Sequence, residues 1–418
     1  MLMMNNKKAK QMYRAMLLLL GAFALLWVIG TVNVFSATFA EDRLSGSAYG
    51  HLLRQLVFSA VGLIPAVMVF RSDYHRLSKY SKLMYVVTLL LLLAVPLIGI
   101  EANGARRWLG VGKLTFQPSE LAKLTAILCT ASLLTPMLKA GKEVTFLAPL
   151  SHNKKAPVWQ RFPWWPQKAL LFTLVLAVPV FKQPDAGTAI IILTLPVLMV
   201  WISGAKLMEV KWPALLVAAG AVFFVLYEPY RRDRIIAWID PWEYEKTLGY
   251  QTVQGLIAIG SGGIFGQGLA EGISKFSYLP EAHTDFAFAV LAQELGLRAS
   301  LGMIVLFGII LVYGCKCAVM CQDPFGRLLA FGTTMYFGVQ GFINIGMVSG
   351  LLPVVGVPLP FISYGGTSLI VNMIAAAILL NICKSNRREA ERQTRLAEER
   401  ELTSMRDETR SVFRPGRH

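Results

Sequence analysis

Three ionisable side chains lie within five residues of one another in the segment LPEAHTDF: Glu281, His283 and Asp285. A carboxylate or imidazole placed beside a hydroxyl can take its proton, so this spacing predicts a positioned general base with substrate contacts around it. Asp285 stands directly before an apolar run that begins at Phe286. The trio is also a candidate site for a divalent cation such as magnesium or manganese, although its spacing is not a specific ligand signature.

Basic side chains form a second chemical set. Arg106 and Arg107 lie in NGARRWLGVGK, and Arg231 and Arg234 lie in YRRDR. Guanidinium groups bind phosphate through paired hydrogen bonds, so beside an apolar groove they suit the anionic head group of a lipid. The alternative is that these cations are solvated or pair with lipid phosphates generally, and the sequence does not separate the two interpretations.

Two further charged positions have competing interpretations. Glu120 and Lys123 are three residues apart in QPSELAK, and therefore neighbours on one helix face. Glu120 is a candidate site residue, or a favourable charge in the first turn after Pro118. Asp185, in KQPDAGT, is a candidate substrate contact, or the cap of the helix beginning at Thr188.

Long apolar segments must position these residues. The chain has 418 residues, of which only 16% are charged, and its mean hydropathy is +0.52. Crossing a bilayer takes about 20 apolar residues in a helix. The sequence therefore predicts an all-α integral membrane protein with about ten spans, near residues 15–35, 56–70, 83–100, 121–138, 169–181, 188–203, 213–226, 300–319, 328–349 and 367–383.

The distribution of basic residues predicts the orientation. With both termini in the cytoplasm, 28 of the 41 lysines and arginines fall in cytoplasmic segments, as the positive-inside rule requires. This placement also explains the net charge of +16 without a nucleic-acid partner. The residues that break the rule include Arg106, Arg107, Arg231 and Arg234, and they lie on the same outer side as Asp285.

The predicted organisation is one membrane domain, residues 1–383, followed by a charged cytoplasmic tail, residues 384–418. A long structured loop, about residues 227–299, lies outside the membrane between spans seven and eight. Its glycine-rich part, residues 254–268, is either tightly packed or, on weaker grounds, a phosphate cradle. The five cysteines fall in or beside spans, and we interpret them as packing residues.

Six motifs in order give the sequence a specific resemblance: NGARRWL, FQPSELAK, KQPDAGT, GYQTVQGLIAIGSGGIFGQGL, YLPEAHTDF and NIGMVSGLLPVVGVPLPFISYGGTS. The chain resembles the SEDS family, the FtsW, RodA and SpoVE proteins, over nearly its whole length, and its motifs are more similar to those of FtsW and SpoVE. The resemblance implies ten spans in the bacterial cytoplasmic membrane and an inverting peptidoglycan glycosyltransferase that uses lipid II in cell division. It places the family's key aspartate on Asp285, with further motif positions on Lys123 and Asp185.

The resemblance also implies partners and a mechanism. The partners are a class B penicillin-binding protein and other membrane proteins of the division or elongation machinery. Asp285 would take the proton of the acceptor hydroxyl, and the basic residues would stabilise the leaving diphosphate, with or without a divalent cation and without a nucleotide. The alternatives are a lipid II flippase or transporter, a RodA-type elongation polymerase, and a scaffold that recruits a synthase.

Overall fold

The structure is a computed structural model of the full chain. It describes residues 2–44, 46–47, 49–102, 105–111, 114–147, 167–206, 208–209, 229–273 and 279–412. The helices in these ranges are α1 Leu2–Leu44, α2 Gly50–Arg71, α3 His75–Ile98, α4 Pro118–Lys139, α5 Lys168–Lys182, α6 Ala186–Ile202, α8 Pro229–Ile239, α9 Tyr250–Ser261, α10 Ala287–Met320, α11 Pro324–Val348 and α12 Gly366–Val412.

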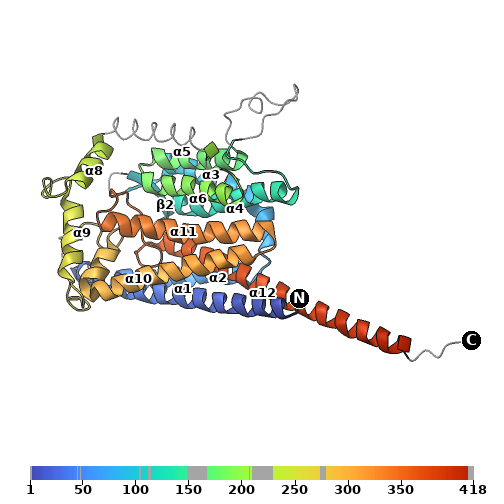
Figure 1. Ribbon diagram of the computed structural model, residues 1–418. Coiled ribbons are helices and arrows are strands. Elements are labelled where there is room, and N and C mark those ends of the chain that lie inside the picture. Colours follow the sequence, from blue (N-terminus) through green and yellow to red (C-terminus); the bar gives the residue numbers. More distant parts are fainter. Residues whose placement is uncertain are drawn as a thin grey trace, which may run out of the picture.

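The described part of the chain is mostly helical, as predicted. Seven of its helices, namely α1, α2, α3, α4, α10, α11 and α12, are long and apolar enough to cross a membrane, and α6 is a shorter apolar helix. The predicted span at residues 213–226 lies outside the described residues. Since these long helices run side by side (Figure 1), the chain is a multi-pass membrane protein.

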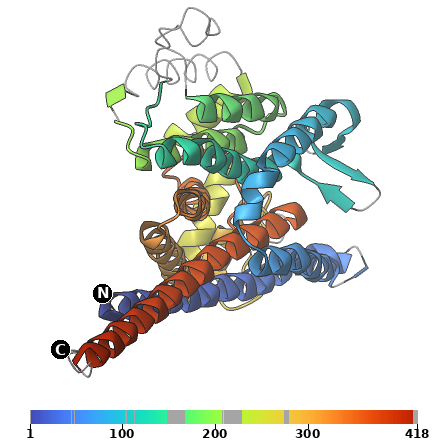
Figure 2. The ribbon, with the colours of Figure 1, turned by 90° about the vertical axis from the view of Figure 1, so that its right-hand side faces the viewer.

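One expectation was incomplete, because the fold is not entirely helical. Three short antiparallel strands, β1 Ile100–Ala102, β2 Ala105–Val111 and β3 Leu114–Phe116, form a sheet in the order β1-β2-β3 between α3 and α4. The sheet projects beside the bundle (Figure 2). Hydropathy did not reveal it, since a seven-residue strand among polar turns carries a weaker pattern than a helix that spans a membrane.

The two ends of the bundle differ. The first helix begins and the last helix ends at one end, while α8 and α9 lie at the other (Figure 1). The charged tail continues α12 as one helix up to Val412, and its distal part projects away from the bundle (Figure 2). The five cysteines are free thiols in the structure, and four of them are buried, as expected of packing residues.

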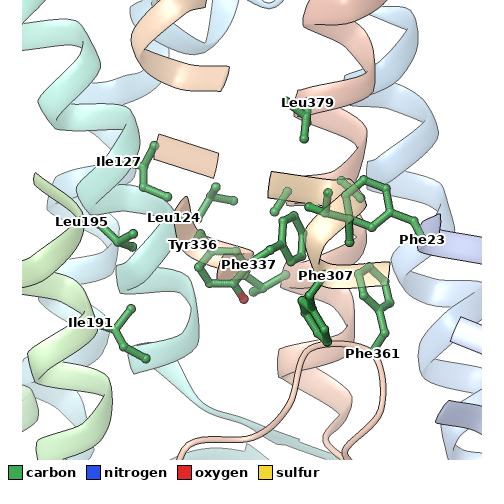
Figure 3. Close-up of a cluster of buried hydrophobic side chains, with 14 of the residues drawn as sticks. Phe23, Leu124, Ile127, Ile191, Leu195, Phe307, Tyr336, Phe337, Phe361 and Leu379 are labelled. Atoms are coloured by element: carbon green, nitrogen blue, oxygen red, sulfur yellow. The ribbon is translucent and has the colours of Figure 1, made fainter. Parts of the chain in front are cut away.

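The core is aromatic where α1, α10 and α11 meet the segment before α12. Phe23 lies 5.0 Å from Phe337 and 5.7 Å from Phe361 between ring centroids (Figure 3). Phe361 belongs to residues 349–365, called here the buried segment. Its backbone approaches α1 so closely that a Cβ on Gly30 would lie 2.0 Å from the Phe361 carbonyl oxygen. The glycine therefore lets irregular backbone enter the bundle.

Helix α10 is interrupted, and the glycine-rich part of the predicted loop donates hydrogen bonds to the carbonyls next to the interruption. Helix α10 begins at Ala287, whereas the sequence predicted a span that begins near residue 300. Gly296 interrupts the helix with a φ of 75°. The amides of Gln267 and Gly268 donate to the carbonyls of Gln293 and Glu294 at 3.0 Å each. These amides are committed to the helix, so tight packing is confirmed as the role of the glycine-rich segment.

Candidate functional site

Asp285 lies in a tight turn before α10. The amides of Thr284 and Phe286 both donate to the carbonyl of Glu281, and the Thr284 hydroxyl donates to the Glu281 carboxylate at 2.5 Å. The ring of Phe286 is fully buried, and it anchors the end of the turn in the core. The Asp285 carboxyl is thereby fixed at the end of the bundle where α8 and α9 lie.

The surroundings of Asp285 make it a base suited to neutral pH. Burial, assisted by the carboxylates of Glu281 and Asp185, raises the pKa of its carboxyl to about 7 against the opposing effect of Arg234 and Arg107. Burial and like charges both disfavour the ionised form. A carboxyl that titrates near the working pH is the most effective general base, because it is often ionised and still accepts a proton readily.

The two arginines that act on Asp285 come from different elements. Arg107 lies on β2, where its Nε donates to the Gln183 carbonyl at 3.0 Å and its Nη2 to the Pro184 carbonyl at 2.5 Å. Arg234 lies on α8, and its Nη1 donates to the Val354 carbonyl at 2.7 Å. Each guanidinium is therefore held by backbone oxygens.

The other predicted cations are placed differently. Successive strand residues point to opposite sides, so Arg106 is directed away from Arg107 and pairs with Glu101 at 3.3 Å on the surface. Arg231 lies on α8 together with Arg234, and its side chain is outside the described part of the structure. The structure therefore brings Arg107 and Arg234, but not Arg106, to Asp285.

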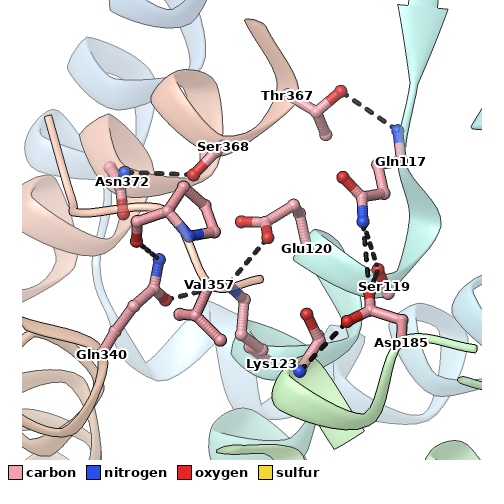
Figure 4. Close-up of polar contacts among 12 residues, drawn as sticks. Gln117, Ser119, Glu120, Lys123, Asp185, Gln340, Val357, Thr367, Ser368 and Asn372 are labelled. Atoms are coloured by element: carbon pink, nitrogen blue, oxygen red, sulfur yellow. Dashed lines mark hydrogen bonds and ion pairs between the residues drawn. The ribbon is translucent and has the colours of Figure 1, made fainter. Parts of the chain in front are cut away.

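Asp185 caps a helix and also joins two helices. Its Oδ1 accepts from the Thr188 amide at 3.2 Å, which confirms the capping interpretation. Its Oδ2 accepts from Ser119 Oγ at 3.1 Å and Gln117 Nε2 at 3.2 Å, at the start of α4 (Figure 4). The Asp185 carboxylate is 97% buried yet acts on the pKa of Asp285, so it borders the site.

Lys123 is not an exposed cation. It is fully buried, and its Nζ donates to Glu120 Oε1 and to Gln340 Oε1, each at 2.8 Å (Figure 4). The Tyr336 ring lies 5.4 Å from the ammonium. A buried ammonium with these partners is not an exposed phosphate contact, so any effect of Lys123 on substrate acts through its neighbours.

The sequence motifs did not reveal how the buried segment completes the site. Asn344 Nδ2 donates to the carbonyls of Asp285 and Val357, at 2.8 and 2.7 Å. Gln340 Nε2 donates to the Pro358 carbonyl at 2.9 Å. A Cβ on Gly356 would lie 3.3 Å from Asp285 Oδ2. The available signal was the pair of amide side chains, Gln340 and Asn344, in a largely apolar helix, because buried amides need partners.

His283 lies among different charged groups from Asp285, with Glu281 as the neighbour that they share. Burial lowers the pKa of His283, and its charged neighbours include Glu41, His51 and Glu281. In the part of the chain that the structure describes, no three His, Cys, Asp or Glu side chains converge as metal ligands do. The trio Glu281, His283 and Asp285 therefore does not fit a metal site, and the divalent cation stays a prediction.

Comparisons with known proteins agree with this architecture. Residues 16–388 match the FtsW/RodA/SpoVE family, described as cell cycle protein. The stage V sporulation protein E of Bacillus subtilis (strain 168) is 36% identical over 376 residues, which cover 89% of this chain and 97% of that protein. The probable peptidoglycan glycosyltransferase FtsW of Geobacter metallireducens is 37% identical over 381 residues, 90% and 96% of the two chains.

Two solved structures share the fold. The rod shape determining protein RodA of Thermus thermophilus superposes with a TM-score of 0.61 at 29% identity, over 88% of this chain and 96% of that one. A chain from the work "Structural coordination of polymerization and crosslinking by a peptidoglycan synthase complex" superposes with a TM-score of 0.66 at 28% identity, over 88% and 97%.

Proposed function

Because the chain belongs to the FtsW/RodA/SpoVE family of cell cycle proteins, we propose that it is a peptidoglycan glycosyltransferase that polymerises lipid II into glycan strands. The observation that carries the proposal is the Asp285 carboxyl, whose pKa is about 7 and which feels the charges of Arg107 and Arg234. A lipid-linked diphosphate sugar needs such a pair of functions: a base for the attacking hydroxyl and cations for the departing phosphate.

Asp285 supplies the base in this reaction. The 4-hydroxyl of the acceptor sugar attacks the anomeric carbon of the donor, and the Asp285 carboxylate takes its proton as the new glycosidic bond forms. The bond from the anomeric carbon to the diphosphate oxygen breaks, and the electron pair leaves with the diphosphate. Positioned general bases contribute about 10²–10⁴-fold, and attack by an oxygen nucleophile opposite the leaving group inverts the anomeric carbon.

Arg107 and Arg234 stabilise the charge that develops on the diphosphate. Fixed cations lower the barrier most when they need not reorganise during the reaction, and both guanidinium groups are held by backbone carbonyls. Arg231 precedes Arg234 by three residues on α8, and it remains a predicted contact of the diphosphate. Asp185 and Lys123 hold the helices that carry the site.

We also propose the finer topology: ten spans in the bacterial cytoplasmic membrane, both termini inside, and residues 227–299 outside. The distribution of 28 of the 41 lysines and arginines supports it. Single cysteines at Ser78 and Thr247, in a chain without the five native cysteines, test it. An impermeant thiol reagent on intact spheroplasts should label the Thr247→Cys variant and spare the Ser78→Cys variant, and the reverse pattern would refute the orientation.

The partner is proposed to be a class B penicillin-binding protein, which would cross-link the strands that this chain polymerises, together with other division proteins. The structural relative from a peptidoglycan synthase complex supports a synthase partner. Affinity purification of the full-length chain from membranes, followed by mass spectrometry, should recover one such transpeptidase. Recovery of polymerising synthases alone would contradict this part of the proposal.

Purified protein and labelled lipid II test the activity itself. Polymer should form with the wild-type chain and its partner. The buried charged pair of Glu120 and Lys123 is the feature that a lipid flippase would also need, so the same preparation in vesicles should be assayed for lipid II movement. Movement without polymer would replace the proposed activity by transport.

Depletion of the protein in cells tests the role in division. Depleted cells should form filaments, as expected for a division enzyme, and rounded cells would indicate the RodA-type role.

A further inference from the structure

Three aromatic side chains from distant parts of the chain meet beside the catalytic turn: His51 from α2, His283 from the turn, and Tyr364 from the buried segment. Their ring centroids lie 5.5 Å apart for His51 and His283, 5.0 Å for His51 and Tyr364, and 5.8 Å for His283 and Tyr364. We call this group the ring triad. The proposed chemistry at Asp285 does not use it.

Polar contacts hold the rings of His51 and Tyr364, and a backbone hydrogen bond ties Tyr364 to His283. His51 Nδ1 lies 2.6 Å from Asp42 Oδ1, and the Arg54 side chain hydrogen-bonds the Tyr364 hydroxyl. The Tyr364 amide donates to the His283 carbonyl at 2.8 Å. The rings are therefore fixed relative to one another and to the catalytic turn, since α1, α2 and the buried segment all contribute to holding them.

Helix capping explains Asp42, but packing does not explain the ring triad. Asp42 also accepts from the His51 amide at 2.8 Å, so its carboxylate caps the start of α2, where backbone donors have no helical partner. The rings, in contrast, are not sealed in the core. The side chains of His51 and His283 are 16% and 25% exposed, and the Glu41 carboxylate, 64% exposed, lies 4.0 Å from His283.

Partly exposed aromatic faces with acidic and basic groups at their rim are suited to a saccharide. Ring faces cover the apolar side of a sugar, and carboxylate, guanidinium and imidazole groups serve its hydroxyls as acceptors and donors. The location fits as well. His283 precedes Asp285 by two residues, a reach of at most about 7 Å, which is comparable to the width of one sugar ring.

We propose that the ring triad, with Arg54 and Glu41 at its rim, binds the sugar next to the one that reacts at Asp285. The proposal rests on the glycosyltransferase function proposed above. It predicts that the triad sets the affinity for the saccharide part of the substrate, while Arg107 and Arg234 contact the diphosphate. His51 and Tyr364 are then binding residues that Asp42 and Arg54 hold in position.

Kinetics of two variants test the proposal. In Tyr364→Ala and His51→Ala, the KM for lipid II should rise about tenfold, the upper end for the loss of one aromatic contact, and kcat should change less than twofold. Glycan strands should become shorter, because a weakly held strand leaves sooner. Tyr364→Phe keeps the ring and should retain most of the affinity. His75→Ala, at the opposite end of the bundle, is the matched control and should behave as wild type.

Asp42→Ala provides the structural comparison, because it removes the cap of α2 and should lower the thermal midpoint. If Tyr364→Ala and His51→Ala show the same loss of midpoint with a lower kcat and an unchanged KM, the triad is only a packing contact and the proposal is wrong.

A soluble probe separates this proposal from the proposed function. The disaccharide of N-acetylglucosamine and N-acetylmuramic acid should bind the wild-type protein, in complex with its partner, and bind Tyr364→Ala about tenfold more weakly. Binding that is equal in the two proteins would refute the saccharide site even if polymerisation is observed. Ring-dependent binding without any polymerisation would leave the site in place and refute the polymerase function.

Discussion

Replacing Asp285 by asparagine should remove activity and increase stability at the same time. The substitution keeps the shape of the side chain and removes its charge. General-base assistance is worth about 10²–10⁴-fold, so polymerisation at pH 8 should fall by that factor. The wild type should lose activity as the pH falls through about 7, where the Asp285 carboxyl takes up its proton, and the variant should lack this dependence.

The gain in stability follows from the same pKa. The carboxyl titrates at 3.8 in a model peptide and at about 7 in the folded protein, so the folded state binds the proton more tightly. The charged form therefore destabilises the fold, increasingly from about pH 4 to pH 7 and fully above, by up to about 4 kcal/mol at 1.36 kcal/mol for each unit. This value is an upper bound, because part of the Asp285 side chain is exposed to solvent.

The assay compares wild type, Asp285→Asn and the control Asp240→Asn, each purified with its partner. Asp240 is an exposed carboxyl at the end of α8, so its variant should keep both activity and stability. Labelled lipid II reports polymerisation, and thermal unfolding at pH 5 and pH 8 reports stability. The Asp285→Asn variant should be more stable than wild type at pH 8, and most of that difference should be gone at pH 5. The assignment of the base would be refuted by substantial polymer from this variant. It would also be refuted if the variant lost activity as the pH falls through about 7, as the wild type does.

Three other substitutions probe the surroundings of Asp285. Lys123→Met leaves the Glu120 carboxylate buried without its cation and should cost about 3–5 kcal/mol of stability, measured by thermal unfolding, whereas the double variant with Glu120→Gln should recover most of it. Gly356→Ala adds a Cβ at a φ of +68°, 3.3 Å from Asp285 Oδ2, and should lower kcat while leaving expression intact; unchanged kcat would show that the buried segment does not position the carboxyl. Arg234→Gln removes a cation that lowers the pKa of Asp285, so the pH at which activity is half lost should rise. A fall of this pH would show that Arg234 does not act on Asp285.

The sequence by itself determined the class of the protein and its chemical residues. Runs of apolar residues require helices that span a membrane, because backbone groups in lipid must be satisfied within the segment. Asp285 was identified from its neighbours in the chain, and so was the capping position of Asp185, since a cap and its amide are only three residues apart. Such local patterns can be read without any knowledge of tertiary contacts.

Only the tertiary structure decided which distant residues meet. The sequence placed Lys123 beside Glu120 on one helix face, but its ammonium is also buried against Gln340, which is 217 positions away. Likewise, Asn344 holds the Asp285 carbonyl, and Arg234 holds the buried segment through Val354. The pKa that makes Asp285 a base also depends on this assembly. Burial and through-space charge are properties of the packed chain, so a single sequence does not contain them in readable form.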